Sequence, residues 1–253
     1  TFHELRVFSQ GMRLAPPCFR LQRTLPVAVA VLLPGAWWVP RSCAGRGLVP
    51  SARTFAMSGA RLPEALVWVD CEMTGLGAEG GPGPDTLLEV AVLITDDHLQ
   101  LVAEGPDVVV HHSDEVLDGM NDWCKRQFGW DDQQKIARPG LLADQVRRSK
   151  VTLEELDQML YEFVTRYVEE KGGILAGNTV HMDKRFLDKF CPKFVNCLHY
   201  RIVDVSTVKE LCRRWYPEQF SRAPKKKDLH RAMDDIRESL KELAFYKEAI
   251  FPK

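Results

Sequence analysis

Four carboxylates and one histidine lie in three distant segments, and their residue types suit catalysis with a divalent cation. Asp70 and Glu72 end an apolar run, Asp183 follows a glycine-containing turn, and His230 and Asp235 lie near the C-terminus. Because strand side chains alternate between faces, Asp70 and Glu72 are expected to point the same way. Unpaired carboxylates are costly to bury, and a hard cation would neutralise them. Oxygen ligands favour magnesium or manganese over zinc.

The last of these segments offers two neighbouring acids. His230 and Asp235 cannot share one helical face, since five residues turn a helix by about 140° beyond a full turn. His230 is therefore expected on the loop that leads into the last helix. Asp234 shares a charged stripe with Glu238 and Lys241. Asp235 instead has small residues three before and four after it, which permit close approach to a sheet. We predict that Asp235 faces inward.

Glu89 is a further acid inside an apolar strand pattern, Leu87-Leu88-Glu89-Val90-Ala91. It is either a polar residue that faces the sheet edge or a carboxylate with a role. The sequence favours neither reading.

The net charge of −1 hides an asymmetry between the two parts of the chain. Residues 1–61 carry eight Arg, no Lys and one acid, whereas residues 62–253 carry 26 Lys and Arg against 34 Asp and Glu, a net charge of −8. Proteins that grip long nucleic acids neutralise many phosphates with basic side chains. A nucleic-acid substrate of this domain would therefore be short and held by local contacts.

The composition divides the chain into a leader over residues 1–61 and one domain over 62–253. The leader is rich in Arg, Ala, Pro and Gly, as is typical of a mitochondrial presequence, with a secretory signal or a disordered extension as alternatives. A shorter product starting at Met57 would lack most of its arginines and would remain in the cytosol or nucleus. The seven cysteines contain no C-x-x-C pair, which disfavours a zinc site or a disulfide framework.

Residues 62–253 alternate between strand and helix patterns. Strands are expected at 66–69, 87–95, 108–111, 174–177 and 202–205, with turns at 96–97 and 105–106. Helices are expected at 152–170, 183–190, 207–215 and 232–250, the first with a capping-box start. This order predicts an α/β fold, with a mixed five-stranded sheet and helices on both faces.

Four motifs occur in a fixed order along this domain. They are DCEMTGL at 70–76, GNTVxxDxxFL at 177–187, HYRxxDVST at 199–207 and HRAMDDI at 230–236. Together they resemble the oligoribonuclease family, the small-RNA 3′-to-5′ exonucleases of the DEDDh group, over residues 65–252. With its Arg-rich leader, the chain resembles the mitochondrial members of that family in animals.

The resemblance implies a ribonuclease-H-like fold, a homodimer, and hydrolysis of short RNA, down to dinucleotides, to nucleoside 5′-monophosphates. Two magnesium or manganese ions, about 3.5–4 Å apart, would bridge the scissile phosphate. By motif, the metal ligands would be Asp70, Glu72, Asp183 and Asp235, with His230 as general base and Tyr200 as a further catalytic residue. The implied substrate contacts are Leu76 and Trp123 for the bases, Arg201 and Ser206 for the terminal phosphate, and Thr179.

The chain departs from the family pattern at several positions. Cys71 replaces the usual Leu between two acids and is expected to face the opposite side of the strand. The loop over 75–88 is longer, and residues 130–139 are inserted. Phe128 stands near the place of a histidine that caps the terminal phosphate in this family.

Two other functions share these features. One is a catalytically weakened dimer that only holds RNA ends, and the presence of all five chemical positions counts against it. The other is a DNA-directed proofreading exonuclease on the same fold, which the acidic domain and the Tyr200-Arg201 pair disfavour. Turnover of a dinucleotide, with and without magnesium, would separate these possibilities.

Overall fold

A computed structural model describes residues 61–77, 83–225 and 230–251. Met57 and all of the leader except Arg61 lie outside the described residues. A five-stranded sheet of order β3-β2-β1-β6-β7 forms the centre. Its strands are β1 (Ala65–Met73), β2 (Leu87–Thr95), β3 (Leu101–Val109), β6 (Gly173–Gly177) and β7 (Ile202–Asp204).

The sheet is mixed, as predicted, and β1 is its central strand. β1 pairs antiparallel with β2 and parallel with β6. β2 pairs antiparallel with β3, and β6 pairs parallel with β7. In this register Glu72 lies opposite Glu89, at the end of β1. All side chains of β2 and most of those of β1 are buried, and nearly all of them are apolar, because helices cover both faces.

Each face of the sheet has its own hydrophobic cluster. The helices of the first cluster are α5 (Leu153–Tyr167), α6 (Val180–Phe190) and α7 (Pro192–Cys197), which pack on Val67, Val69 and Cys71 of β1. The helices of the second are α8 (Val205–Trp215), α9 (Pro217–Ser221) and α10 (Ala232–Ile250), which pack around Trp68. Successive residues of β1 thus face opposite clusters, as strand geometry requires.

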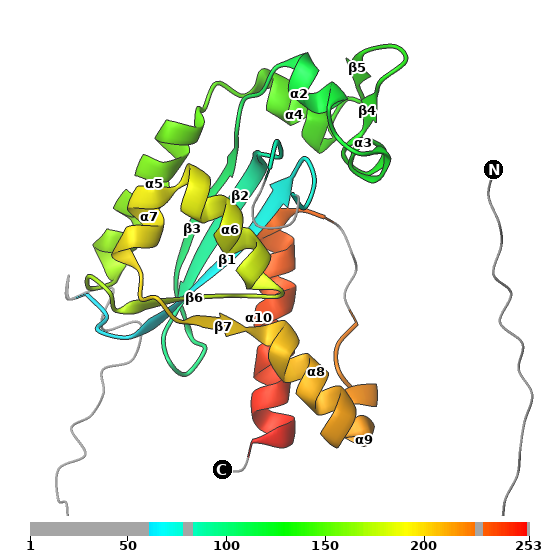
Figure 1. The fold of residues 1–253 in the computed structure, drawn as a ribbon. Helices are drawn as coiled ribbons and strands as arrows, with labels where there is room; N and C mark the ends of the chain where they lie inside the picture. The colour runs from blue at the N-terminus through cyan, green and yellow to red at the C-terminus, as the bar shows by residue number, and fades with distance from the viewer. Residues whose placement is uncertain (1–60, 78–82, 226–229, 252–253) are drawn as a thin grey trace, which may run out of the picture. The chain divides into compact units, whose positions relative to one another are not determined.

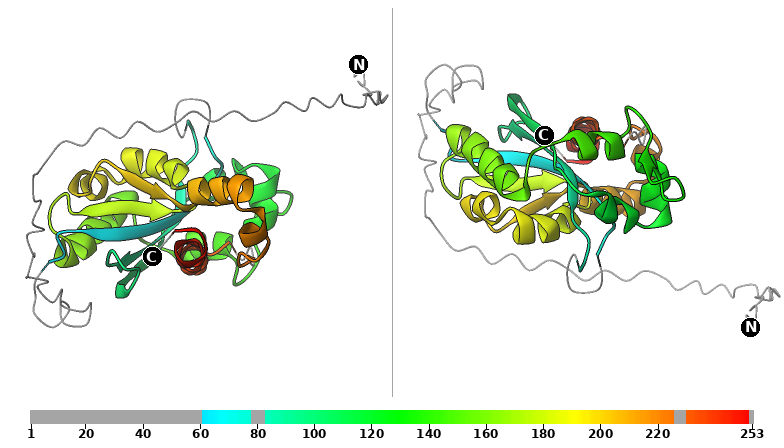
Figure 2. Two further views of the ribbon diagram at one scale, coloured as in Figure 1. Left: turned by 90° about the horizontal axis from the view of Figure 1, so that it is seen from below. Right: turned by 90° about the horizontal axis from the view of Figure 1, so that it is seen from above.

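A third group of short elements gathers beyond the end of the sheet where β1 finishes (Figures 1 and 2). It consists of α2 (Asp114–Asp118), α3 (Asp122–Phe128), β4 (Trp130–Asp131), β5 (Ile136–Ala137) and α4 (Leu142–Arg148). The β4–β5 hairpin lies within residues 130–139. These are the residues that the sequence predicts as an insertion relative to the family pattern. Trp130 anchors this hairpin, since its ring is buried and the Arg147 guanidinium lies 5.9 Å from its centroid.

The third strand differs from the sequence prediction. Gly105 and Pro106 lie inside β3 rather than in a turn, and β3 begins at Leu101. Pro106 is tolerated there because β3 is an edge strand, where one missing N–H need not break a ladder. Gly105 is needed because a Cβ would come within 2.7 Å of the Phe163 ring of α5. The pairing with β2 also shifts near Val92.

The helices follow the prediction more closely. The capping box is formed, with Thr152 and Glu155 each bonding the backbone N–H of the other. Helices α6 and α8 begin three and two residues earlier than expected, and the short helices α7 and α9 were not predicted. The five described cysteines are free and buried. Among the described residues, no helix is both long and apolar enough to cross a membrane.

Asp157 provides a test of how α5 and α7 are joined. Its buried carboxylate accepts hydrogen bonds from the backbone N–H groups of Lys193 (3.0 Å) and Phe194 (2.8 Å). Asp157→Ala should lower the free energy of unfolding by about 1–3 kcal/mol, because these amides lose their acceptors. Urea denaturation measures the effect, with Glu154→Ala, an exposed change on the same helix, as the control. Equal midpoints for both variants would contradict this role.

Candidate active site

The end of β1 places two acids on the face of the sheet that α10 covers. Asp70 and Glu72 occupy the same alternating positions as Trp68, which packs in the α10 cluster. The Glu72 side chain is buried, and Asp70 is half-buried. Pairing with β2 becomes irregular just after Glu72, so the ladder ends at this carboxylate.

The start of α10 brings two further groups to Glu72. One possible ligand atom from each of Glu72, His230 and Asp235 lies within 4.8 Å of the others. His230 stands just outside the helix, as predicted, with φ of 50°. Asp234 points elsewhere, since its carboxylate accepts a hydrogen bond from Arg237 at 3.1 Å. The helix phase deduced from the sequence therefore matches the observed one.

Asp183 reaches the same strand end from the other face of the sheet. It lies in the first turn of α6 and is buried, and its Oδ1 accepts a hydrogen bond from the Cys71 N–H at 2.9 Å. Burial raises the pKa of Asp183 to about 7. The nearby Asp183 and Asp70 carboxylates also contribute to a raised pKa of the Cys71 thiol, after burial itself.

The carboxylates oppose one another's ionisation. Burial, together with the negative charges of Asp235, Glu89 and Asp183, raises the pKa of Glu72 from 4.5 to about 8. A group of oxygen donors that resists ionisation in this way fits hard divalent cations, which neutralise such clusters. The candidate ligands are therefore Asp70, Glu72, Asp183 and Asp235, with the His230 imidazole beside them.

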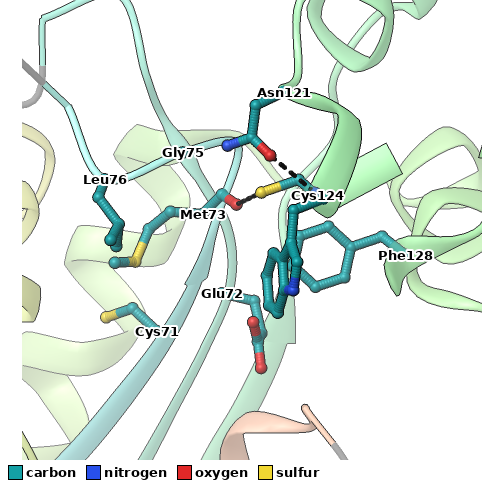
Figure 3. Close-up of a pocket in the computed structure, with 9 residues that line it drawn as sticks. Cys71, Glu72, Met73, Gly75, Leu76, Asn121, Cys124 and Phe128 are labelled. Atoms are coloured by element: carbon teal, nitrogen blue, oxygen red, sulfur yellow. Dashed lines mark hydrogen bonds between the residues drawn. The ribbon is translucent and has the colours of Figure 1, made fainter. Parts of the chain in front are cut away.

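A cavity of about 410 Å³ opens beside Glu72 (Figure 3). Its wall comes from the end of β1, the loop after it and α3, and its lining residues are Cys71, Glu72, Met73, Gly75, Leu76, Asn121, Trp123, Cys124 and Phe128. Most of this lining is apolar, and one carboxylate, Glu72, faces it. An apolar cavity of this size suits flat, uncharged rings, and a phosphate attached to them would need a cation between it and Glu72.

Two exposed apolar side chains flank this cavity. Leu76 is 65% exposed and Trp123 is 50% exposed, although large apolar residues are usually covered. The Trp123 ring meets the His230 ring edge-on, with centroids 5.2 Å apart. Phe128 is buried and lies edge-on to Trp123 at 6.3 Å. Phe128 therefore supports the Trp123 ring and offers no polar atom at the position where the family resemblance implies a histidine.

Thr179 and Ser206 form a polar cluster at the starts of α6 and α8. Their hydroxyl oxygens lie 3.0 Å apart, and the Thr179 N–H donates to Asp204 and to Ser206, each at 2.9 Å. Thr179 adopts a left-handed conformation with φ of 55°. Because Asp183 lies one turn further along α6, this cluster and the carboxylates share the C-terminal edge of the sheet.

Tyr200 and Arg201 do not reach the carboxylates of their own chain. They precede β7, whose first residue pairs with Leu175, and Leu175 pairs with Val67 of β1. Five residues of strand, roughly 16 Å, separate Val67 from Glu72. Tyr200 is 77% exposed and stacks on His199 at 4.4 Å. The two residues therefore lie near the opposite end of the sheet.

The sequence left Glu89 open and did not single out Arg231. Glu89 does not face an edge, because β2 lies inside the sheet and the residue is fully buried. It pairs with Arg231, the residue after His230. The sequence offered two signals for this pair: an acid within an apolar strand, and an arginine next to a candidate base. Neither residue alone indicates which residue it pairs with.

Comparisons with known proteins agree with this geometry. Residues 67–243 match the family described as Exonuclease (RNase_T). The chain is 48% identical to the human protein named mitochondrial oligoribonuclease, over 78% of this chain and 77% of the relative. It is also 48% identical to a probable oligoribonuclease of Dictyostelium discoideum, over 74% of this chain and 90% of the relative.

The solved structures that match share the fold. Exonuclease I from Methylocaldum szegediense superposes with a TM-score of 0.53 at 17% identity, over 74% of this chain and 41% of that chain. An Escherichia coli exonuclease I in complex with a dA16 oligonucleotide gives a TM-score of 0.54 at 15% identity, over 74% of this chain and 41% of that one. The predicted ribonuclease-H-like α/β fold is thereby confirmed.

The raised pKa values predict an unusual pH dependence for the metal-free protein. Because folding favours the protonated forms of Glu72 and Asp183, their stabilising contribution is complete below about pH 4 and is lost as the pH rises toward 8. With EDTA, the melting temperature should fall by about 5 °C between pH 5 and pH 8. Added manganese should restore it at pH 8.

Glu72→Gln tests the assignment of this effect, because the amide keeps the shape of the side chain but cannot ionise. The fall in melting temperature with EDTA should be smaller in this variant than in the wild type. Glu154→Gln, an exposed change on α5, should behave like the wild type. A wild-type melting temperature that rises across this range in EDTA would contradict the crowded-carboxylate account.

Proposed function

The chain belongs to the oligoribonuclease family of 3′-to-5′ exoribonucleases, and we propose that it hydrolyses short oligoribonucleotides and dinucleotides to nucleoside 5′-monophosphates beside Glu72. The single observation that carries this proposal is the convergence of Glu72, His230 and Asp235 within 4.8 Å. That convergence lies next to an apolar cavity flanked by Leu76 and Trp123. A short substrate also fits a domain whose net charge is −8.

Enzymes of this exonuclease family depend on divalent metals, and the donor set of this chain suits magnesium or manganese. We infer that two ions are held by Asp70, Glu72, Asp183 and Asp235. When bound, such ions act as Lewis acids that activate water and stabilise charge on phosphate oxygens. The four carboxylates supply negative charge that offsets the charge of the ions and fixes their position.

Other side chains of the site accept the proton, bind the bases and contact the phosphate. The His230 imidazole accepts the proton of the attacking water, because a neutral imidazole is a suitable base near pH 7. Trp123 packs edge-on against that ring and limits its rotation. Trp123 holds a base by stacking, at an energy of about 1–3 kcal/mol, and Leu76 wedges against the bases by apolar contact. Thr179 and Ser206 present hydroxyl groups to the phosphate.

We propose that the chain works as a homodimer. Tyr200 and Arg201 match catalytic and phosphate-binding positions of the family, yet they lie at the far end of the sheet from Glu72 in their own chain. Both are exposed, with the Arg201 guanidinium 5.5 Å from the centroid of the Tyr200 ring. A second copy could supply this pair to the site, so that each site would be completed only in the dimer.

The location of the protein is proposed on similar grounds. Relatives from human, cattle and mouse are named mitochondrial oligoribonucleases. We propose a mitochondrial location, in the matrix or the intermembrane space, with residues 1–61 as the presequence and 62–253 as the exonuclease domain. The shorter cytosolic or nuclear product from Met57 gains no support from these relatives.

The two neighbouring acids of α10 provide the first test of the site. Asp235→Ala should reduce turnover of a dinucleotide at least about 100-fold, because a clustered carboxylate is lost. Asp234→Ala should change it less than about threefold, since that carboxylate pairs with the half-exposed Arg237. Initial rates with saturating magnesium measure both variants. The reverse ranking would show that α10 presents its other face to the substrate.

Substrate length provides the second test. Turnover should fall as RNA lengthens from two to twenty nucleotides, because the acidic domain gains little from further phosphates. Removing the 5′ phosphate of the dinucleotide should also lower turnover, since Arg201 then has no anion to bind. Both series are run on labelled RNA with magnesium and with EDTA, and a DNA dinucleotide serves as the matched control.

The outcomes separate the competing functions. Binding of the dinucleotide without hydrolysis in a single turnover would favour the RNA-end-binding dimer. Faster hydrolysis of DNA than of RNA would favour the proofreading exonuclease. Equal turnover of two-residue and twenty-residue RNA would contradict the short-substrate specificity.

A further inference from the structure

Glu89 and Arg231 form an ion pair beside the carboxylate cluster, and the proposed chemistry does not use either residue. Arg231 Nη2 donates to Glu89 Oε1 at 2.8 Å, and Nε donates to the two carboxylate oxygens at 3.1 and 3.3 Å. The Glu89 side chain is fully buried, whereas that of Arg231 is 40% exposed. A two-pronged guanidinium contact of this kind fixes orientation as well as charge.

The pair connects the sheet to the candidate base. Glu89 lies opposite Glu72 in the β1–β2 register, and Arg231 directly follows His230 in the chain. Arg231 also donates to the Gln145 side chain of α4 at 3.3 Å. The residue next to His230 is thereby held from two sides, by β2 and by α4.

His230 requires such support because its backbone is strained. Its φ of 50° is a left-handed conformation that a residue with a Cβ adopts at a cost of about 1–3 kcal/mol. Such conformations persist only where the surroundings hold them. Arg231 is the next residue along the chain, and its contacts with Glu89 and Gln145 hold the backbone directly after His230.

Asp235, in contrast, has support of its own. Helix α10 packs along its length, and Met233, Ile236 and Tyr246 are buried in the second hydrophobic cluster. The backbone N–H of Asp235 also donates to the Arg231 carbonyl at 3.0 Å, within the first turn. Loosening the Arg231 side chain therefore affects the residue outside the helix more than the residue inside it.

We propose that Glu89 and Arg231 are positioning residues that hold His230 over Glu72 in the orientation needed for proton transfer. This inference rests on the proposed function, in which His230 is the base. Glu89 in this account is no metal ligand, because its carboxylate is occupied by the guanidinium. Arg231 also offsets the charge that Glu89 would otherwise direct at Glu72.

Arg231→Lys is the most informative variant. Lysine keeps a positive charge near Glu89, so that no buried carboxylate is left unpaired, but it loses the two-pronged contact. The kcat for a dinucleotide should fall about 10- to 100-fold, as a small misplacement of a catalytic group does. KM should stay within about twofold, and so should the manganese dissociation constant measured by calorimetry.

Two further variants act as controls. Arg237→Lys changes an arginine of the same helix that pairs with Glu104 and Asp234 at the surface, and it should keep the wild-type kcat. The double variant Glu89→Gln/Arg231→Gln removes both charges together. It should show the same loss of kcat as Arg231→Lys while melting near the wild-type temperature, which separates positioning from folding.

A double-mutant cycle with His230→Ala completes the test. His230→Ala alone should reduce kcat about 10²- to 10⁴-fold, and it should cost far less in the Arg231→Lys background. Losses that multiply fully would overturn the positioning role, as would a wild-type kcat in Arg231→Lys. A weaker manganese affinity in Arg231→Lys would overturn it too, because the pair would then support the metal ligands. Full activity of His230→Ala alone would instead reject the proposed base.

Discussion

Repulsion between carboxylates at the end of β1 is the force that the rest of the domain has to overcome. Asp183 and Asp235 arrive from opposite faces of the sheet, on α6 and α10, and both approach Glu72. The single hydrogen bond from the Cys71 N–H to Asp183 Oδ1 is too weak to bring these like charges together by itself. The hydrophobic clusters on the two faces do so, because α6 and α10 each bury an apolar stripe against β1 and β2. Apolar packing thus maintains an unfavourable electrostatic arrangement that a cation would relieve.

Much of this site could be predicted from the sequence, because the periodicities of strands and helices depend only on residues close together in the chain. Alternation along β1 placed Asp70 and Glu72 on one face, and the turn per residue of a helix distinguished Asp235 from Asp234. The assignment of His230 to the loop before α10 followed from the same arithmetic. These deductions need only the neighbouring residues. Pairings such as Glu89 with Arg231 join residues 142 positions apart, and no local pattern indicates them.

The third motif spans two parts of the sheet. Tyr200, Arg201 and Ser206 are close in sequence, and the family resemblance implies a catalytic or substrate-binding role for each of them. Strand β7 runs between them, so Tyr200 and Arg201 lie before it and Ser206 lies after it, on α8. Even a strand of three residues carries the chain from one part of the sheet to another. The sequence motif is continuous, but its parts face different surroundings.

The two edge strands of the central sheet, β3 and β7, are both poor partners for a further strand, for different reasons. On β3 the ring of Pro106 removes one N–H from the ladder, and Glu104 carries a charge that Arg237 of α10 matches. On the other side β7 offers only three residues. Neither edge strand therefore offers a long, regular row of free backbone N–H and C=O groups with which a strand from another molecule could pair. Both edges of this valine- and leucine-rich sheet therefore disfavour pairing with a strand from another molecule.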